Sequence, residues 1–599
     1  MRSDLPSPFA ATAVTALTMA AFAVGFLLLA VRFHEVQVES AALYAEGMSR
    51  QSVSRVLTTG ARGRILDRHG RVLVENRRSR TIVCDAAAFQ RRTWDATAEA
   101  MAAAIAELGG EIGLESPLDA AAIAARLRRE VSLPLEVWRD IGFRELARFS
   151  ERQYRHPGFR VETTSVREYP HGALAAHVLG YVGRDRGEGA AGDENFRFRE
   201  FELRGRAGLE SHYDEFLRGV SGEKRLRVDV RGFTVEERTV TPAQAGPDLV
   251  LALDLELQRT VERELGGLKG ACVVLDPRDG SVLAMASAPA YDLSRFSPTI
   301  DAGFYASLRD DPAKPLVNRA AAGVYAPGST FKPITALAAL ESGQSPDTAY
   351  ECCGVFSLGG MNLRCSRRWG HGEIDLVHAL KVSCNPYFCN LGMMTGTNLL
   401  MTAAHGFALG SRTGLDLPVD AAGVVPDHDW KMLRYHERWY PGDLAQMSIG
   451  QGMLLVSPLQ MARVAGALGT GYLVTPHLKA EVQSRREKLA FSRTSLAAVR
   501  RGMYEVVNGV DEYGHLDGSG RLAGENLAVR ICGKTGTAEV GTGATRRKNT
   551  WFIAYAPAVN PTVAVALVVE NGASGGSTAA PRVRNVLAAI FGEAEGGGG

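Results

Sequence analysis

The sequence predicts an α+β protein that is anchored in a membrane and whose C-terminal domain has an antiparallel sheet packed on helices. Three observations lead to this prediction. An uncharged apolar run occupies residues 10–31. β-rich segments stand at both ends of residues 246–592 with helical segments between them, which indicates one sheet closed by the two ends of the domain. A chain of 599 residues also exceeds one ordinary core, so two or more domains are expected.

The apolar run from Ala10 to Val31 has the length of a helix that spans the core of a bilayer. Arg2 precedes the run and Arg32 follows it, so the positive-inside signal is weak. We predict a single-pass protein of the cytoplasmic (inner) membrane, with a cytoplasmic tail of residues 1–9, a transmembrane helix over 10–32 and the remainder outside. A cleaved signal peptide is the alternative, but the run is longer than a usual signal segment and no small-x-small cleavage site follows it.

The rest of the composition is that of a globular protein, with 46% hydrophobic residues, 22% charged residues and a formal net charge of +2. This balance gives no reason to expect nucleic acid as a partner. We place the boundary between two extracytoplasmic domains near Ala245, which gives domains of residues 33–245 and 246–592. The glycine-rich end, residues 593–599, is expected to be a disordered tail.

β-rich runs mark the two ends of the C-terminal domain. Residues 271–287 contain two such runs around Asp279-Gly280, which is the pattern of a hairpin. Later runs occupy residues 529–540, 549–557 and 562–570. In the N-terminal domain, residues 62–76 predict two short strands joined at His69-Gly70, and residues 93–150 have helical periodicity without a catalytic signal.

The clearest chemical signal is the segment APGSTFKP, in which Ser329 and Lys332 open an apolar helix. Positions i and i+3 share one face of a helix, so the serine hydroxyl and the lysine amine can meet at its first turn. A serine hydroxyl is a poor nucleophile until a neighbouring group takes its proton. Lysine does so only as a neutral amine, which burial and a second nearby cation both favour. Alone, this pattern is weak, because a helix cap followed by a surface lysine gives the same letters.

Two further motifs strengthen the interpretation. Ser383-Cys384-Asn385 ends the helical run DLVHALKVSCN, and the tetrapeptide KTGT at residues 534–537 lies within a predicted strand. The trio S-x-x-K, S-x-N and K-T-G in that order is the signature of penicilloyl-serine transferases. We therefore predict that residues far apart in the sequence form one acyl-transfer site.

Each predicted catalytic residue has a role in acyl transfer. Ser329 is the nucleophile and Lys332 is its base. Ser383 passes a proton toward the leaving amine, and Asn385 binds the substrate amide. Lys534 adds a positive field that helps to keep Lys332 neutral and attracts a terminal carboxylate.

The rest of the K-T-G strand is predicted to bind substrate. Thr535 and Thr537 offer hydroxyl groups to the terminal carboxylate of the substrate. Gly536 lets a substrate backbone lie against the strand edge. The backbone N–H groups of Ser329 and Thr537 would form the oxyanion hole.

Beyond the trio, the chain resembles class B penicillin-binding proteins over residues 62–569. Three segments are similar to the box motifs of the non-catalytic pedestal domain of this class, namely RGRILDRHGRVLVEN, EYPHGALAAHVLGYVG and GRAGLESHYDEFLRG. SIGQGMLLVSPLQMA and NTWFIAYAP are similar to a helix and a terminal strand of its transpeptidase domain. Within the class, RWGHGEIDLVHALKVSCNPYF and WYPGDLAQMSIGQG are more similar to the elongation type than to the division type.

The resemblance implies an elongated pedestal domain followed by a penicillin-binding transpeptidase domain in the periplasm. The substrates would be peptidoglycan stem peptides ending in D-Ala-D-Ala, cross-linked through an acyl-enzyme on Ser329 during cell elongation and shape maintenance. β-Lactam antibiotics would acylate the same serine. The implied partners are a polytopic glycosyltransferase and other proteins of the elongation complex. The chemistry itself needs no cofactor.

Five of the eight cysteines crowd into one segment of the sequence. Cys352, Cys365, His371 and Cys384 have the ligand chemistry of a closed tetrahedral Zn²⁺ site, and we favour Cys352 over Cys353 as the first ligand. Such a site would hold the S-x-N motif in register, because Cys384 is its middle residue. Some elongation-type relatives resemble this, with ligands at matching positions. A disulfide such as Cys365–Cys384, or free buried thiols, would also account for these residues.

Two other classes of function use the same motifs. A D,D-carboxypeptidase or a β-lactamase passes the acyl group to water, and the sequence shows no recognisable device for the deacylating water of a β-lactamase. A penicillin-binding sensor or scaffold would use the fold without cross-linking, but sensors usually carry extra membrane segments. Rapid turnover of penicillin would indicate a β-lactamase, whereas a transpeptidase is expected to keep a long-lived acyl-enzyme.

Overall fold

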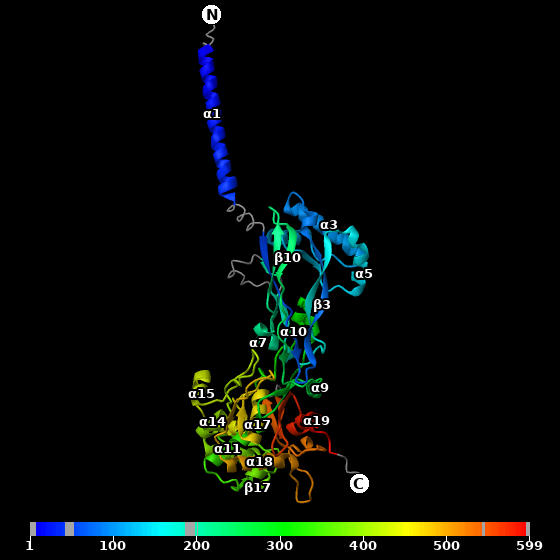
Figure 1. Ribbon diagram of the computed structural model, residues 1–599. Helices are drawn as coiled ribbons and strands as arrows, with labels where there is room; N and C mark the ends of the chain where they lie inside the picture. Colours follow the sequence, from blue (N-terminus) through cyan, green and yellow to red (C-terminus); the bar gives the residue numbers. More distant parts are fainter. Residues whose placement is uncertain (1–7, 42–52, 186–197, 200–201, 542–545, 595–599) are drawn as a thin grey trace.

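The computed structural model describes residues 8–41, 53–185, 198–199, 202–541 and 546–594. Figure 1 shows a long single helix, a pedestal domain of sheets and helices, and a C-terminal domain in which helices surround a sheet. The predicted α+β architecture is confirmed. Most of the predicted cytoplasmic tail, residues 1–9, and of the predicted disordered tail, residues 593–599, lies outside the described residues.

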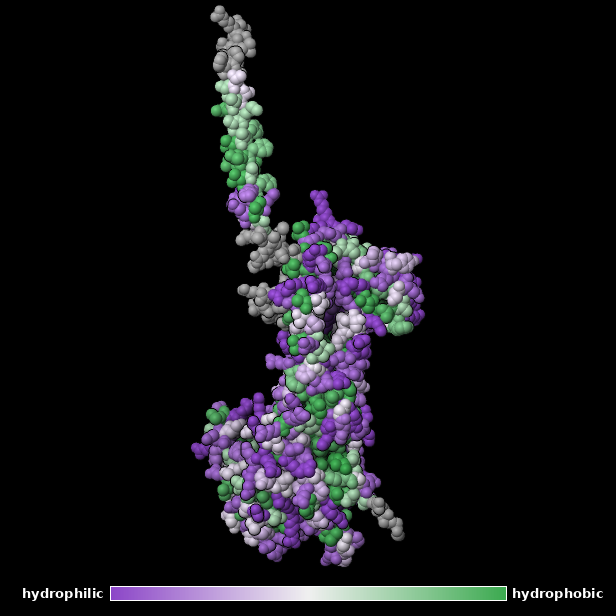
Figure 2. Space-filling model, in the orientation of Figure 1, coloured by the Kyte–Doolittle hydropathy of each residue, from purple (hydrophilic) through white to green (hydrophobic). Residues whose placement is uncertain are grey.

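The N-terminal helix α1 runs from Pro8 to His34 and is followed by a short π-helix, Glu35–Glu39. The segment Thr12–Glu39 has a mean hydropathy of 2.4 in its most apolar window, and none of that window is buried against the rest of the protein. Figure 2 shows this mostly hydrophobic column standing apart from the two domains. Its length and composition fit one membrane span, as predicted for residues 10–32.

A long antiparallel strand pair forms the spine of the pedestal domain. Strand β3 (Val72–Cys84) pairs with β5 (Phe159–Glu168), and the register runs from Glu75 opposite Glu168 to Cys84 opposite Phe159. The two predicted strands around His69-Gly70 are β2 (Ile65–Leu66) and the start of β3. Gly70 has a φ of 78°, a left-handed conformation that glycine adopts without steric cost.

The other described strands of the pedestal are β1 (Val53–Thr58), β4 (Leu135–Trp138), β6 (Val182–Asp185), β7 (Phe198–Arg199), β8 (Glu202–Gly205), β9 (Gly222–Val228) and β10 (Thr234–Thr241). Its helices are α3 (Trp94–Ile112), α4 (Ala120–Glu130), α5 (Phe143–Arg152), α6 (Ala176–Leu179), α7 (Gly208–His212) and α8 (Asp214–Leu217). The helical periodicity of residues 93–150 is thus confirmed except at β4. That strand adds to the edge of β3, a long-range pairing that the local sequence does not reveal.

A buried cluster of charges joins the first and third of the segments that resemble pedestal box motifs to Arg167, the residue just before the second. The fully buried carboxylate of Glu210 accepts hydrogen bonds from Arg62 Nε at 3.0 Å and from Arg167 Nε at 2.6 Å. Arg62 also pairs with Asp214 at 2.7 Å. A buried charge without a partner is strongly destabilising, so the third segment supplies the countercharges that the other two regions need.

The boundary between the two domains is bridged by backbone pairing and by charge. Strand β11 (Leu249–Val250) pairs in parallel with β2 of the pedestal. Asp67, in the turn after β2, accepts a hydrogen bond from the backbone N–H of Leu255 at 3.2 Å. Arg71 reaches Asp254 at 3.1 Å. These contacts attach the pedestal to the first helix of the C-terminal domain.

The C-terminal domain is built on one antiparallel sheet with the strand order β13-β12-β22-β21-β20. The strands are β12 (Gly270–Leu275), β13 (Val282–Ala288), β20 (Cys532–Val540), β21 (Arg547–Ala556) and β22 (Val563–Glu570). Because β12 pairs with β22, the start and the end of the domain meet in the middle of the sheet. This confirms the predicted closure.

Helices cover both faces of this sheet (Figure 1). Cys272 and Val274 pack in a core that includes α9 (Leu255–Glu264) and α19 (Ala580–Phe591), whereas the alternate residue Val273 belongs to the core on the opposite face. That opposite core includes α11 (Lys332–Glu341), α12 (Leu376–Lys381), α13 (Asn385–Thr395), α14 (Thr397–Gly406), α16 (Pro441–Ser448), α17 (Pro458–Thr470) and part of α18 (Arg493–Asn508). The helices α10 (Ala302–Asp310) and α15 (His428–Tyr435) lie nearer the surface.

Candidate active site

The three predicted motifs meet where the end strand β20 lies against the turn that carries the nucleophile. This 3-10 turn spans Gly328–Phe331 and leads directly into α11. Gly328 has a φ of 56°, and a Cβ atom added there would lie 2.8 Å from the Thr537 carbonyl oxygen. A Cβ on Gly536 would lie 2.8 Å from Thr330 Cγ2. Both glycines are therefore needed for the turn to pack directly on the strand.

Ser329 and Lys332 lie at the start and just past the end of this turn. Residues i and i+3 eclipse one another in a 3-10 helix, so the two side chains project from the same side of the chain. The hydroxyl of Ser329, which is half-buried, makes no hydrogen bond with another described residue. The Lys332 amine instead bonds to the S-x-N motif, so the serine–base hydrogen bond is not formed in this state. Catalytic hydrogen bonds often form only when substrate is bound.

The Lys332 amine is fully buried and lies beside the S-x-N motif. It donates to the backbone carbonyl of Ser383 at 2.7 Å and to Asn385 Oδ1 at 2.8 Å. Burial lowers the pKa of Lys332 to about 8. A base with this pKa is partly neutral at physiological pH, as proton abstraction from a serine requires.

Ser383 lies between two lysine amines. Lys534 Nζ donates to Ser383 Oγ at 2.8 Å, and Lys332 Nζ lies 3.4 Å from the same oxygen. Burial and the charge of Lys332 hold the pKa of Lys534 well below its usual value. Ser383 has a φ of 58°, which is costly for a residue with a Cβ and is found at functional sites.

Asn385 is the first residue of helix α13, and hydrogen bonds fix both the oxygen and the nitrogen of its side-chain amide. Its Oδ1 accepts from Lys332, and its Nδ2 donates to the backbone carbonyl of Arg364 at 2.8 Å. The side-chain amide of Asn385 still has one unused lone pair on its oxygen and one unused hydrogen on its nitrogen. Both can bond to an amide of the substrate. Arg364 ends β16 (Met361–Arg364), so the segment with the cysteines touches the catalytic motif. The sequence did not predict this contact.

The hydroxyl groups of the K-T-G strand have partners on neighbouring loops. Thr537 Oγ1 accepts from the backbone N–H of Gly575 at 3.2 Å. Thr535 Oγ1 lies 3.1 Å from Ser519 Oγ and 3.4 Å from Lys534 Nζ. Ser519 was not among the predicted site residues, because no pattern in its local sequence marks it.

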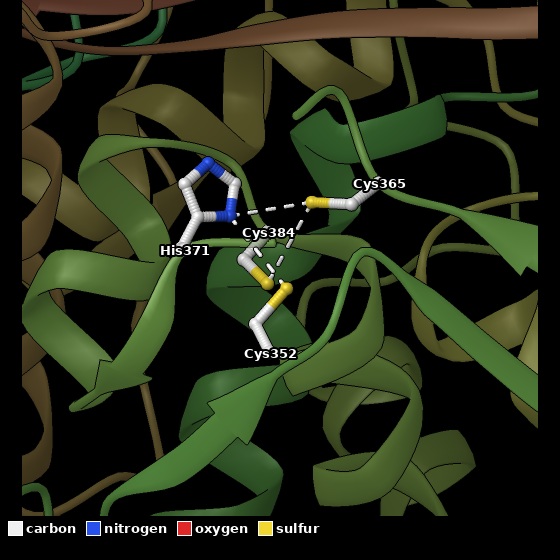
Figure 3. Close-up of side chains that lie close together, drawn as sticks. All are labelled: Cys352, Cys365, His371 and Cys384. Atoms are coloured by element: carbon white, nitrogen blue, oxygen red, sulfur yellow. Dashed lines mark hydrogen bonds between the residues drawn. The ribbon is translucent and has the colours of Figure 1, made fainter. Parts of the chain in front are cut away.

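The cysteines and histidine predicted to bind metal lie together, as Figure 3 shows. His371 Nδ1 is 3.7 Å from the sulfur of Cys352 and 3.3 Å from that of Cys365, and the sulfurs of Cys365 and Cys384 are 3.9 Å apart. All four donor atoms lie within 4.8 Å of one another. The ligands of tetrahedral Zn²⁺ are separated by about 3.6–3.8 Å, as follows from Zn–S and Zn–N bond lengths, so the donor set fits that ion.

Short strands and a helix start hold this cysteine–histidine cluster (Cys352, Cys365, His371 and Cys384). The strands are β14 (Tyr350–Cys352), β15 (Val355–Leu358), β16 and β17 (Gly372–Ile374), and Cys384 is the N-cap of α13. The hydrogen bond between Cys365 and Cys384 lowers the pKa of the Cys365 thiol and raises that of the Cys384 thiol, so Cys365 is the thiolate of this pair and Cys384 keeps its proton. Cys353 is exposed, and all eight cysteines are free in this structure.

Four other cysteines lie in the cores and are buried: Cys84, Cys272, Cys389 and Cys532. Burial raises the pKa of the Cys84 and Cys389 thiols to about 12, so these groups stay neutral. His177 is also buried, and its Nε2 lies 2.6 Å from the carbonyl oxygen of Pro315. Burial lowers the pKa of His177 to about 4.

The sequence of this chain is similar to known penicillin-binding proteins over most of its length. The family profile described as "Penicillin binding protein transpeptidase domain" matches residues 270–588, and "Penicillin-binding Protein dimerisation domain" matches residues 57–251. The chain is 32% identical to "Peptidoglycan D,D-transpeptidase MrdA" of Haemophilus influenzae over 607 residues, which covers 95% of this chain and 90% of the relative. It is 33% identical to the protein of the same name from Escherichia coli K12, with 75% of each chain covered.

Solved structures of similar proteins cover most of the chain. The complex between penicillin-binding protein PBP2 and MreC from Helicobacter pylori matches with a TM-score of 0.77 and 27% identity, covering 90% of this chain and 98% of that one. Pseudomonas aeruginosa PBP2 in complex with WCK 5153 matches with a TM-score of 0.65 and 28% identity, covering 90% and 96% of the respective chains.

Proposed function

This chain belongs to the penicillin-binding protein transpeptidase family, and from that premise we propose that it is a serine D,D-transpeptidase that cross-links peptidoglycan stem peptides. The acyl-enzyme forms on Ser329, and β-lactams acylate the same residue. The similarity to MrdA and PBP2 proteins supports a role in cell elongation and shape maintenance. The observation that carries the chemistry is the pair of buried amines, Lys332 and Lys534, on either side of Ser383.

The acylation step follows from this arrangement. Neutral Lys332 takes the proton of Ser329 as the serine oxygen attacks the penultimate D-Ala carbonyl. The backbone N–H groups of Ser329 and Thr537, on adjoining segments, stabilise the oxyanion. Ser383, between the two amines, delivers a proton to the nitrogen of the leaving D-Ala. The C–N bond breaks, and an ester remains on Ser329.

The substrate is held by groups around the same strand. The Lys534 amine and the hydroxyl groups of Thr535 and Thr537 donate hydrogen bonds to the terminal carboxylate, while Asn385 binds a backbone amide of the stem peptide. Gly536 keeps the strand free of a side chain where the nucleophile turn and the substrate both approach. The amine of a second stem peptide then attacks the ester, forms the cross-link and releases Ser329.

Replacing Ser329 with Ala tests this function. The variant is expected to lose labelling by fluorescent penicillin and the formation of cross-linked dimers together. Cross-linking that survives in the variant would reject Ser329 as the nucleophile. In the unaltered protein, release of D-Ala without dimers would indicate a D,D-carboxypeptidase, and labelling without either product would indicate a sensor or scaffold.

We also propose that the cysteine–histidine cluster holds one structural Zn²⁺. The spacing of its four donor atoms and their thiol and imidazole chemistry support this proposal. The ion would supply no step of the reaction but would fix the segment between Cys352 and Cys384 against Asn385. Metal analysis of the purified protein before and after chelation tests the proposal, and a preparation active without stoichiometric zinc would contradict it.

We propose that the N-terminus lies in the cytoplasm and that the pedestal, residues 33–245, and the transpeptidase domain, residues 246–592, lie in the periplasm. Among the described residues, one helix is long and apolar enough to cross a membrane, and the proposed cross-linking of peptidoglycan takes place outside the membrane. Attaching an alkaline phosphatase reporter to the C-terminus tests the orientation. An inactive phosphatase in intact cells would contradict it.

Partners are proposed from the solved relatives. One similar structure is the complex of PBP2 and MreC from Helicobacter pylori, and another is entitled "Structural coordination of polymerization and crosslinking by a peptidoglycan synthase complex". We therefore propose that this chain works with a scaffold protein of the elongation complex and with a polytopic glycosyltransferase. Co-purification of the full-length chain with each candidate in detergent tests the proposal.

A further inference from the structure

Ser519 lies beside the K-T-G strand and belongs to none of the three motifs. Its hydroxyl oxygen is 3.1 Å from Thr535 Oγ1, on a loop that connects α18 to β20. Ser519 is half-buried and Thr535 is buried. The pair therefore stands at the edge of the site, next to the oxygen that the proposed mechanism assigns to the terminal carboxylate.

The backbone of Ser519 is fixed by contacts on several sides. Its N–H donates to the carbonyl of Lys381 at 3.1 Å. A Cβ on the preceding Gly518 would lie 2.2 Å from the Val506 carbonyl oxygen, and one on Gly576 would lie 2.6 Å from the Ser519 carbonyl oxygen. The loop thus passes tightly between α18 and the segment after β22, so the position of the Ser519 hydroxyl is set in advance of substrate binding.

Lys381 holds the part of this loop that precedes Ser519. Its amine, which is almost fully buried, forms an ion pair with Asp517 at 2.7 Å and donates to the Val510 carbonyl at 2.8 Å. Lys381 is the last residue of α12 and lies two residues before Ser383. The helix end that presents Ser383 therefore also places Ser519.

A hydroxyl group has one hydrogen and two lone pairs. The Ser519 hydroxyl, 3.1 Å away, can donate to Thr535 Oγ1. Lys534 Nζ lies farther from this oxygen, at 3.4 Å, and has closer acceptors in Ser383 Oγ and the Thr535 carbonyl. When Ser519 donates to Thr535, the Thr535 hydrogen is left to point elsewhere. The acceptor that the proposed mechanism brings to this place is a carboxylate, which forms stronger hydrogen bonds than a neutral oxygen.

We propose that Ser519 is a positioning residue for recognition of the donor's terminal carboxylate, which rests on the proposed D,D-transpeptidase function. By donating to Thr535, Ser519 directs the Thr535 hydrogen toward the carboxylate. Lys381 holds Ser519 in place for this purpose. Ser519 should therefore speed acylation by donors that carry a terminal carboxylate, and should have little effect on acylation by donors without one.

The test uses the full-length chain in detergent and two donors. Benzoyl-D-alanyl-thioglycolate carries a carboxylate where the terminal D-Ala has one, and its methyl ester lacks that charge. For Ser519→Ala, we expect kcat/KM of Ser329 acylation to fall about five- to tenfold with the acid, mainly through KM, and less than about twofold with the ester. Ser519→Thr keeps the hydroxyl group and should restore the preference for the acid.

Lys381→Met is the second variant and should reduce the same preference by releasing the loop. Equal losses with both donors, or no loss with either, in a Ser519→Ala protein with an unchanged melting temperature would overturn the proposal. Failure of the unaltered chain to be acylated by either donor would instead refute the proposed function on which the proposal rests.

Discussion

Raising the pH from about 7 to about 9 should speed acylation of Ser329 by benzylpenicillin about tenfold, because Lys332 accepts the serine proton only as a neutral amine. Burial lowers the pKa of Lys332 to about 8. With that value about a tenth of the protein has a neutral Lys332 at pH 7 and about nine-tenths at pH 9. The second-order acylation rate reports the free enzyme, so its midpoint should lie near the pKa of Lys332.

The same shift has a defined sign for stability. The folded-state pKa of Lys332 lies below its ordinary value, so the folded protein binds this proton less tightly than the unfolded chain. The contribution of Lys332 to stability is therefore largest above its unfolded pKa and is lost as the pH falls through about 8. Titration of this lysine does not loosen the fold in the range where the rate rises.

The assay is stopped-flow or quenched labelling at several penicillin concentrations, with circular dichroism at each pH to verify that the protein stays folded. Lys332→Arg keeps the charge but cannot become neutral, and it should be inactive across the whole range. A rate that is flat or falls between about pH 7 and 9 in a folded protein would refute the assignment of Lys332 as the base.

Three other predictions concern the metal cluster, the pedestal and the nucleophile turn. Cys365→Ser should lose bound zinc and have a lower melting temperature. Cys353→Ser changes a cysteine outside the cluster and should alter neither the zinc content nor the melting temperature. Equal zinc content in the two variants would contradict the site. Glu210→Gln leaves the buried Arg167 without its carboxylate partner and removes one of the two carboxylates that pair with Arg62, so it should lower the free energy of unfolding by about 3–5 kcal/mol in urea titrations. A loss below about 1 kcal/mol would contradict the buried cluster. Gly450→Ala places a Cβ 2.0 Å from the Gly328 carbonyl oxygen, so penicillin acylation should slow at least about tenfold, and an unchanged rate would show that the turn tolerates displacement.

Local patterns in the sequence were sufficient for the chemistry-bearing motifs and the sheet. β-rich apolar runs predicted the hairpin of β12 and β13 and the later strands, because a strand that is buried on both faces has an almost continuous apolar sequence. The spacing of Ser329 and Lys332 predicted their shared turn, because residues three apart lie on the same side of a helical turn whatever packs around it. The apolar run of α1 predicted the anchor, since a membrane span depends on length and composition alone.

Contacts between distant segments could not be predicted in the same way. Nothing near Glu210 indicates that its partners are Arg62 and Arg167, and nothing near Ser519 indicates that it lies beside Thr535. β4 was missed because its pairing with β3 is what makes it a strand.

The sequence by itself determined which residue types are available for acyl transfer, in which order they occur along the chain, and that one apolar helix precedes them. The tertiary structure alone decided that the Lys332 and Lys534 amines are buried away from solvent and that both lie next to the Ser383 hydroxyl. It also decided that Cys352 is buried in the cluster while Cys353 is exposed. The physical reason is that burial and the company of a second charge are properties of packed neighbours, and these neighbours come from segments far apart in the chain.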